Sequence, residues 1–339
     1  MSYPRAFNAL TWGGIARKIA AGGIASELDA DAPSPFTRIG PGFAKSPKPD
    51  LCESAGDAGK DYRPIEGGGV WGLDHLSFAK ETNGTSFAAP LLAREAAFVL
   101  QALQAQCSGD TRPFACTAKA VLAISAFDVA GGLQPSLHKL AKRTLGYGLA
   151  RSEQFTTASR QRARFVWQGI IEHESDIVRV QLPVPLAWLS SAASPLMRMC
   201  VSWDTPVNAA AELEWSCRDV EVKLFSDPEA SKGVKGSNRS AAGYPLFTES
   251  WNLALVGEAD LKSDLWVVEL SYKQQAAYPA GRIPSVSQRV AFVAELWDDA
   301  EEPVDPHSYV QRLPIASSLS RLSNTSVWLG QPTAIVSEF

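Results

Sequence analysis

The spacing of apolar residues divides the chain into a helical part and a strand-rich part. From Ser86 onward, apolar side chains recur at intervals of three and four residues, which predicts a helix that ends near Cys107. Two further helices are predicted over 117–127 and 135–143, and the second begins at Pro135, where a missing N–H costs nothing. This stretch of the chain is therefore expected to be mainly helical.

After about Arg160, apolar residues no longer recur every three or four positions but at every second position, as in a β-strand. The alternation predicts seven short strands with Pro, Gly and Asp turns between them: 165–172, 177–182, 197–203, 220–225, 251–256, 265–272 and 290–297. Such a series is typical of an antiparallel β-sandwich, here of a jelly-roll-like kind. Arg160, Arg162 and Arg164 share one face where the first strand begins, and we expect a solvated edge that deters strand pairing rather than a ligand patch.

The N-terminal part has weaker patterning. Residues 7–12 form a short apolar run that predicts a buried strand ending at Gly13-Gly14. Residues 30–72 contain six prolines and three consecutive glycines, so they are expected to be a loop. A loop of that length is seldom mere filler.

The composition argues against nucleic-acid-binding and membrane-bound classes of protein. The chain has 339 residues, with 45% hydrophobic residues, 32 Lys and Arg against 36 Asp and Glu, and a net charge of −4. These values are typical of a globular chain of two domains and give no basic footprint for nucleic acid or an anionic membrane. No run is apolar for long enough to span a membrane and no secretory signal follows Met1, so a cytoplasmic protein is expected.

The five cysteines give no metal or disulfide framework. Their number is odd and no C-x-x-C pair occurs, so reduced structural thiols are the favoured interpretation, with a bond between Cys107 and Cys116 as the alternative. Asp50, Asp57, Asp61 and Asp74 have carboxylates suited to calcium, but their spacing fits no EF-hand loop and solvated loop acids are expected. No cofactor is identified from these patterns.

The most informative stretch is Gly84-Thr85-Ser86-Phe87-Ala88-Ala89-Pro90, which predicts a tight turn opening into a helix. Gly84 permits close backbone approach, and Pro90 falls in the first helical turn, where proline is tolerated. Ser86 would lie at the helix start, where unpaired N–H groups and the positive end of the dipole favour a developing oxyanion. The alternative is that Ser86 is only a helix N-cap.

The seven-residue string resembles the serine motif of the subtilisin-like serine proteases. Four more stretches resemble landmarks of that family in the same order: Asn8–Gly14, Phe36–Gly42 with Lys48-Pro49-Asp50, Ala120–Ala126 and Leu145–Gly148. The resemblance implies an α/β fold, in which 1–158 is the C-terminal portion of a three-layer subtilisin-like domain with a parallel sheet. A β-sandwich accessory domain over 159–312 and a tail over 313–339 would follow. It also implies Ser86 as the nucleophile in a turn with Gly84 and Thr85, and Gly68 and Gly69 as candidates for a wall of the substrate cleft. A peptide or protein substrate and calcium as the family's possible metal are implied as well.

The family's Asp, His and oxyanion Asn are not found ahead of Ser86. Only 85 residues precede it, and none of the four histidines stands in the H-G-T-x-V-A-G context. A serine hydrolase needs a base and an orienting acid, so we expect both to come from sequence before Met1 or from a second chain. The 339 residues alone should then have little activity, and the missing strands should leave an exposed sheet edge.

Two other interpretations stay open. One is an inactive subtilase relic that acts as a protein-interaction module through its sandwich. The other uses His75 as a local base beside Asp74, but adjacent side chains of an extended segment point in opposite directions, so Asp74 would not orient His75.

Overall fold

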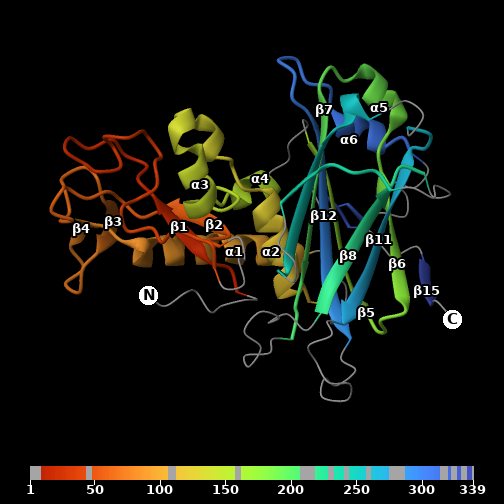
Figure 1. The fold of residues 1–339 in the computed structure, drawn as a ribbon, viewed down its shortest axis with the longest axis horizontal. Helices are drawn as coiled ribbons and strands as arrows, with labels where there is room; N and C mark the ends of the chain where they lie inside the picture. Colours follow the sequence, from red (N-terminus) through yellow and green to blue (C-terminus); the bar gives the residue numbers. More distant parts are fainter. Residues whose placement is uncertain are drawn as a thin grey trace. The chain divides into compact units, whose positions relative to one another are not determined.

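The computed structural model describes most of the chain: residues 9–42, 48–105, 112–156, 162–206, 218–227, 233–239, 244–256, 261–274, 287–313, 320–321, 327–329 and 334–337. Helices are combined with sheets that are mostly antiparallel, an α/β fold in the general sense (Figure 1). Two compact units divide the chain. Unit 1 is Met1–Val99 with Ser125–Ser152, and unit 2 is Leu100–Ile124 with Glu153–Phe339. Unit 2 therefore begins six residues before the boundary expected after residue 158 and also contains a segment from the helical part.

Unit 1 is built on a short parallel pair of strands. β1 (Trp12–Ile15) and β2 (Leu51–Ser54) pair in register from Trp12 with Leu51 to Ile15 with Ser54. The expected strand over 7–12 is thus displaced, and the two glycines expected to end it lie inside β1; residues 7 and 8 fall outside the described residues. β2 was not expected, since it lies in the segment assigned to a loop.

The expectation of an exposed sheet edge is wrong for the described part of unit 1. On the outer edge of β1, the Ala16 N–H donates to the Ala32 carbonyl at 3.0 Å and the Ser34 N–H donates to the Gly14 carbonyl at 2.9 Å. On the outer edge of β2, the Cys52 N–H donates to the Gly148 carbonyl at 2.8 Å. The chain itself therefore occupies both edges, because loop segments fold back along them.

Two 3₁₀ turns and a helix cover this pair: η2 (Ala130–Gly132), η3 (Pro135–Leu137) and α3 (His138–Thr144). Together they contribute to a buried cluster of Ile15, Cys52, Val129, Leu133, Ala141, Leu145 and Leu149. The chain leaves α3 through Gly146, whose φ of +64° suits glycine and where a Cβ would lie 2.1 Å from the Asp50 carbonyl oxygen. This close approach lets the Tyr147 N–H bond the same oxygen at 2.7 Å.

The segment between β2 and the long helix forms an antiparallel ribbon. β3 (Val70–Leu73) pairs with β4 (Ala79–Thr82), and α1 (Thr85–Gln104) follows at once. The start of α1 agrees with the prediction to one residue, while its predicted end at Cys107 lies outside the described residues. By length and apolar composition alone α1 is long enough to cross a membrane, a test that core helices also pass, and 28% of its most apolar stretch is buried.

Unit 2 contains the seven strands predicted from the alternation, with shifted ends. They are β5 (Arg162–Ile171), β6 (Asp176–Pro183), β7 (Pro195–Trp203), β8 (Arg218–Phe225), β10 (Leu246–Asn252), β11 (Leu265–Gln274) and β12 (Gln288–Asp298). The largest error is β10, which begins five residues early and gives way to a 3₁₀ turn, η4 (Leu253–Leu255). Other short elements were not predicted either: α4 (Ser152–Thr156), α5 (Leu186–Ser191), α6 (Pro306–Val310) and β9 (Ser237–Arg239).

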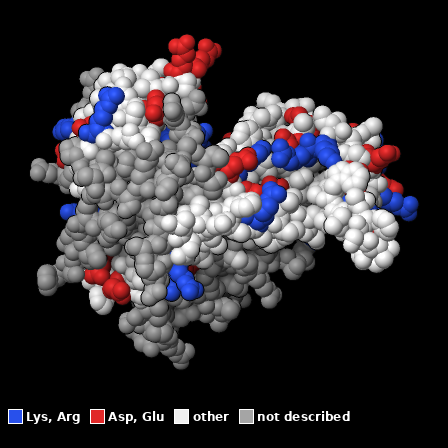
Figure 2. Space-filling view, turned by 180° about the vertical axis from the view of Figure 1, so that it is seen from behind, with Lys and Arg blue, Asp and Glu red and all other residues white. Residues whose placement is uncertain are grey.

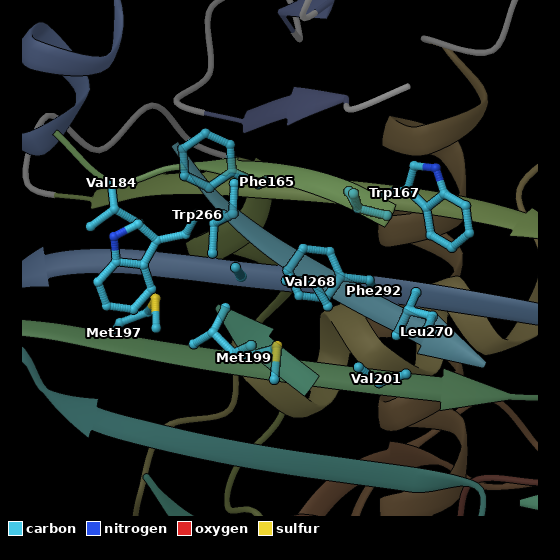
Figure 3. Packing of buried hydrophobic residues seen from close by; sticks show 14 of the residues in the cluster. Phe165, Trp167, Val184, Met197, Met199, Val201, Trp266, Val268, Leu270 and Phe292 are labelled. Atoms are coloured by element: carbon cyan, nitrogen blue, oxygen red, sulfur yellow. The ribbon is translucent and has the colours of Figure 1, made fainter. Parts of the chain in front are cut away.

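These strands form two facing sheets. One has the order β13-β14-β5-β12-β7-β10-β9, and the other β15-β6-β11-β8, where β13 is Ser320–Arg321, β14 is Val327–Leu329 and β15 is Ala334–Ser337. Side chains from both sheets interdigitate in a single core that includes Phe165, Trp167, Met199, Trp266 and Phe292 (Figure 3). The predicted antiparallel sandwich is therefore confirmed as an arrangement of two packed, mainly antiparallel sheets.

The segment expected to be a tail contributes three of these strands: β13 (Ser320–Arg321), β14 (Val327–Leu329) and β15 (Ala334–Ser337). β14 pairs in parallel with β5, and β15 pairs in antiparallel with β6. The last residues are thus part of both sheets of the sandwich rather than an appendage.

The outer face of the larger sheet carries a helix and a buried ion cluster. α2 (Ala115–Ile124), predicted over 117–127, lies on this face, where Thr117 Oγ1 donates to Gln168 Oε1 at 2.7 Å. Beside it, Arg164 Nε lies 2.6 Å from Glu295 Oε1, and both side chains are buried. The expected solvated edge is therefore wrong, because β5 lies between β14 and β12; Arg160 falls outside the described residues.

The described cysteines agree with the thiol interpretation. Cys52, Cys116 and Cys200 are free and buried. Burial raises the pKa of the Cys52 thiol well above its usual value, and it has the same effect on Cys116 and Cys200, so all three are protonated and unreactive at neutral pH. Cys107, the other partner of the alternative bond, falls outside the described residues, and Cys116 is free.

Candidate active site

The serine turn is fixed to the end of a parallel strand. The Gly84 N–H donates to the Ala55 carbonyl at 2.7 Å, one residue beyond β2, and the Phe87 N–H donates back to the Gly84 carbonyl at 3.0 Å. Gly84 has a backbone φ of +126°, a value that residues with a Cβ rarely adopt. A glycine is therefore required at this turn for conformational reasons, and the turn starts α1 directly after β4.

Two side chains hold the turn from either side. Trp12 Nε1 donates to the Thr85 carbonyl at 3.2 Å, and Asn83 Nδ2 donates to the Asp57 carbonyl at 2.9 Å. The first bond connects the turn to β1, and the second connects it to the segment after β2. Residues of unit 1 that are distant in the sequence therefore hold Thr85 and its neighbours in place.

Ser86 is the second residue of α1 and its side chain is exposed. The first N–H groups of a helix have no partner inside the helix. The Phe87 N–H is taken by the Gly84 carbonyl, so the Ser86 N–H is the amide that can face a bound oxyanion. Within the described residues no hydrogen bond is made by Ser86 Oγ. The hydroxyl thus has the accessibility that a nucleophile needs and lacks a base.

His75 is not positioned to be that base. It lies at the turn of the β3–β4 ribbon, whereas Ser86 follows the opposite end, roughly 10 Å of strand away at about 3.3 Å per residue. Asp74 does not orient His75, because its Oδ1 accepts from the Leu76 N–H at 2.8 Å and the Phe78 N–H at 3.0 Å. Both findings remove the support for this alternative.

The other histidines have structural surroundings. His138 Nε2 lies 2.8 Å from the Leu133 carbonyl oxygen, although the sequence favours a solvated position. His173 and His307 belong to unit 2, and His307 Nε2 lies 3.0 Å from Gln311 Nε2. None of the four histidines is hydrogen-bonded to Ser86 in the part of the chain that the structure describes.

Buried carboxylates brace the strands around the site. Asp50 Oδ2 lies 2.6 Å from Lys48 Nζ and accepts from the Thr11 N–H at 2.7 Å. Asp57 accepts from the N–H groups of Ala25 and Ala58 at 2.9 and 2.8 Å. Both acids were expected to be solvated, and both are buried because each one ties separate loop segments together.

The pKa values of Asp57 and of Glu53, another acid of unit 1, are displaced in opposite directions. Burial acts to raise the pKa of Asp57, but the hydrogen bonds from Ala25, Ser26 and Ala58 outweigh it and hold the value below the usual one. For Glu53, in β2, burial dominates and raises the pKa above its usual value, with the nearby Glu95 adding to the effect and the Ser54 N–H opposing it. Glu53 is thus the acid of unit 1 that resists ionisation.

The candidate cleft residues Gly68 and Gly69 lie under the ribbon. The Gly68 carbonyl accepts from the Asp57 N–H at 2.8 Å, and the Gly69 N–H donates to Glu81 Oε1 at 2.9 Å. Both glycines are buried, and a Cβ at Gly69 would lie 2.6 Å from the Thr82 carbonyl oxygen. Their backbone therefore supports the ribbon and is not part of the exposed surface beside Ser86.

No group of three or more His, Cys, Asp or Glu side chains suited to a metal ion occurs among the described residues. On the face shown in Figure 2, acidic side chains lie close to many of the basic ones.

Comparison of the sequence with protein-family models and with curated protein sequences gave no match. The assignment of a function therefore depends on the serine motif and on the geometry around it. The anchoring residues Trp12 and Ala55 escaped the sequence analysis, because nothing in their local sequence marks contacts with residues so distant along the chain.

Proposed function

We propose that Ser86 is the nucleophile of a subtilisin-like serine endopeptidase, and that unit 1 is the C-terminal part of its catalytic domain. The observation that carries this proposal is the exposed Ser86 at the start of α1, in a glycine turn bonded to the end of a parallel strand. The parallel pair followed by the serine helix is in keeping with the subtilisin-like three-layer arrangement.

In the proposed reaction, Ser86 Oγ attacks the carbonyl carbon of a peptide bond and transfers its proton to a base. The Ser86 N–H at the start of α1 stabilises the negative oxygen that forms. The C–N bond breaks as the base returns the proton to the leaving amine, and water then hydrolyses the ester on Ser86. The base and its orienting acid come from polypeptide other than the described residues.

A chemical rescue tests this assignment. Imidazole added at high concentration replaces a missing histidine as base, so the 339-residue chain should hydrolyse p-nitrophenyl acetate faster with imidazole than imidazole alone does. Oxyanion donors without a triad retain on the order of 10³-fold catalysis over water, which makes the effect measurable. The Ser86→Ala variant should fall to the rate of imidazole alone, and equal rates for both proteins would overturn the proposal.

A second candidate is a subtilase relic that serves as an interaction module. It is favoured by the many large apolar side chains that unit 1 exposes: Trp12, Ile19, Leu28, Ile39, Tyr62, Trp71, Leu73, Leu76, Phe78, Phe98 and Phe127. The coding DNA next to the first codon discriminates between the two. An H-G-T-x-V-A-G stretch there, intact or frameshifted, supports the protease, and its absence supports the relic.

A further inference from the structure

The β3–β4 ribbon, residues 70–82, exposes four large apolar side chains within eight residues. Trp71 is 63% exposed, Leu73 75%, Leu76 62% and Phe78 66%. Single exposed apolar residues are common on protein surfaces, but Trp71 and Leu73 lie two residues apart in β3 and so share one face of the ribbon, which makes this face a candidate interaction site. The ribbon is therefore the first place in unit 1 to look for a bound partner.

The ribbon is held in shape by its own polar groups. Asp74 Oδ1 accepts from two amides of the turn, and Glu81 accepts from the Gly67 and Gly69 N–H groups at 2.8 and 2.9 Å. These bonds lower the pKa of Glu81, and Lys18 Nζ lies 3.6 Å from its Oε1. Both acids of the ribbon are already matched, and Lys80, which pairs with Gly72, lies on the face opposite to Trp71 and Leu73. A ligand that meets these two apolar side chains therefore needs no charge.

The outer edge of β3 has free backbone groups. The Asp74 N–H bonds the Phe78 carbonyl at 2.9 Å, and bonds across an antiparallel pair fall on alternate residues. The N–H and C=O of Trp71 and Leu73 therefore point away from β4, and the described sheet consists of these two strands only. An edge of this kind is a template for an added strand.

We propose that the outer edge of β3 binds an extended, uncharged and apolar segment of polypeptide as a third strand. This inference rests on the proposed function, in which the segment belongs to the substrate, since only Asn83 and Gly84 separate β4 from α1. Main-chain bonds to Trp71 and Leu73 would supply the affinity. Contact with their side chains would select apolar residues at alternate positions.

Three fluorescein-labelled heptapeptides test the proposal by fluorescence anisotropy with the full 339-residue chain. The first is Gly-Leu-Thr-Leu-Thr-Leu-Gly, the second carries backbone N-methyl groups on alternate residues, and the third has serine in place of every leucine. The first peptide should bind at least tenfold more tightly than either of the others. Equal binding of the first two would overturn strand addition.

Variants locate the site. Leu73→Ser should weaken binding of the first peptide at least tenfold, whereas Phe98→Ser, which changes an exposed apolar residue of α1, should leave it within twofold. Co-sedimentation with phosphatidylcholine vesicles tests a lipid surface instead. Vesicle binding that Leu73→Ser abolishes, without peptide binding, would overturn the proposal.

The two proposals fail separately. Binding of the first peptide to the ribbon with no Ser86-dependent ester hydrolysis would remove the protease assignment and leave the ribbon as a binding surface. Ser86-dependent hydrolysis without peptide binding would remove only the ribbon inference.

Discussion

The Gly84 N–H donates to the Ala55 carbonyl oxygen at 2.7 Å, and this bond joins the serine turn to the end of β2. It requires the φ of +126° at Gly84, although a Cβ there would meet no atom within 4 Å. The cost of a side chain at this position is therefore conformational and not steric.

Gly84→Ala should destabilise the chain by about 1–3 kcal/mol, the usual cost of holding a non-glycine residue in such a conformation. The measurement is urea unfolding followed by circular dichroism. Gly132→Ala is the matched control, because a Cβ there also meets no neighbouring atom and its φ is not in the left-handed region. An unchanged midpoint for Gly84→Ala would show that the turn relaxes without strain.

Replacement of Glu53 by Gln should stabilise the chain at neutral pH. The folded pKa of Glu53 is raised by burial, so the folded state binds more protons than the unfolded state just above the ordinary pKa of 4.5. Stability is therefore lost as the pH rises through this window, and Gln removes that loss while it keeps an acceptor for the Ser54 N–H.

The check is the urea midpoint of both proteins from pH 4 to pH 8. The advantage of Glu53→Gln should shrink as the pH falls through and below 4.5, because both states of the wild type then hold the proton. Glu66→Gln, which changes an exposed acid, should give no comparable gain. A gain that is the same at every pH would contradict the ionisation argument.

The contribution of Asp57 to stability should depend on pH in the opposite direction to that of Glu53. Its folded pKa is held below the ordinary value of 3.8, so its stabilising effect is present above that value and is lost as the pH falls through the folded pKa. Asp57→Asn should cost about 1–3 kcal/mol at pH 7, since an amide nitrogen then faces backbone donors. The difference in unfolding free energy from the wild type should narrow below pH 3.8, and a difference independent of pH would refute this account.

The buried ion pair between Arg164 and Glu295 in unit 2 should contribute more to stability than an exposed ion pair. Glu295→Ala leaves the buried guanidinium of Arg164 without its carboxylate and should cost about 3–5 kcal/mol. Glu269→Ala removes the partner of Arg179, whose side chain is 46% exposed, and should cost at most about 1 kcal/mol. Urea unfolding of the two variants side by side tests the contrast, and similar losses would mean that burial does not decide the energy.

The sandwich of unit 2 was predictable because its strands have a clear local pattern. Apolar side chains of β5, β7 and β12 alternate toward one core, and this period is visible in the sequence without any tertiary information. The pairing of β14 with β5 was not predictable, since a three-residue strand has no pattern of its own. The burial of Arg164 was not predictable either, because it depends on pairing with strands from distant parts of the chain.

Unit 1 was less predictable because its strands are short and its order depends on contacts between loops. β2 was hidden in a proline-rich segment, and the edge of β1 is covered through Thr37 Oγ1, which donates to the Gly14 carbonyl at 2.7 Å. The position of Ser86 at the start of α1 was predicted, since the glycine turn and the apolar helix have local signals. The bond from Trp12 to Thr85 was not, because 73 residues separate its partners.

The most direct test of the proposed nucleophile is a covalent adduct located by mass spectrometry. A fluorophosphonate forms a bond between phosphorus and Ser86 Oγ as fluoride leaves, and the reaction requires a base to take the hydroxyl proton. The account predicts an adduct on Ser86 of the 339-residue chain when imidazole is present, and none in buffer alone. Labelling of Ser86 in buffer alone would contradict the absence of a base among these residues, and labelling of other serines but not Ser86 with imidazole would contradict the assignment of the nucleophile.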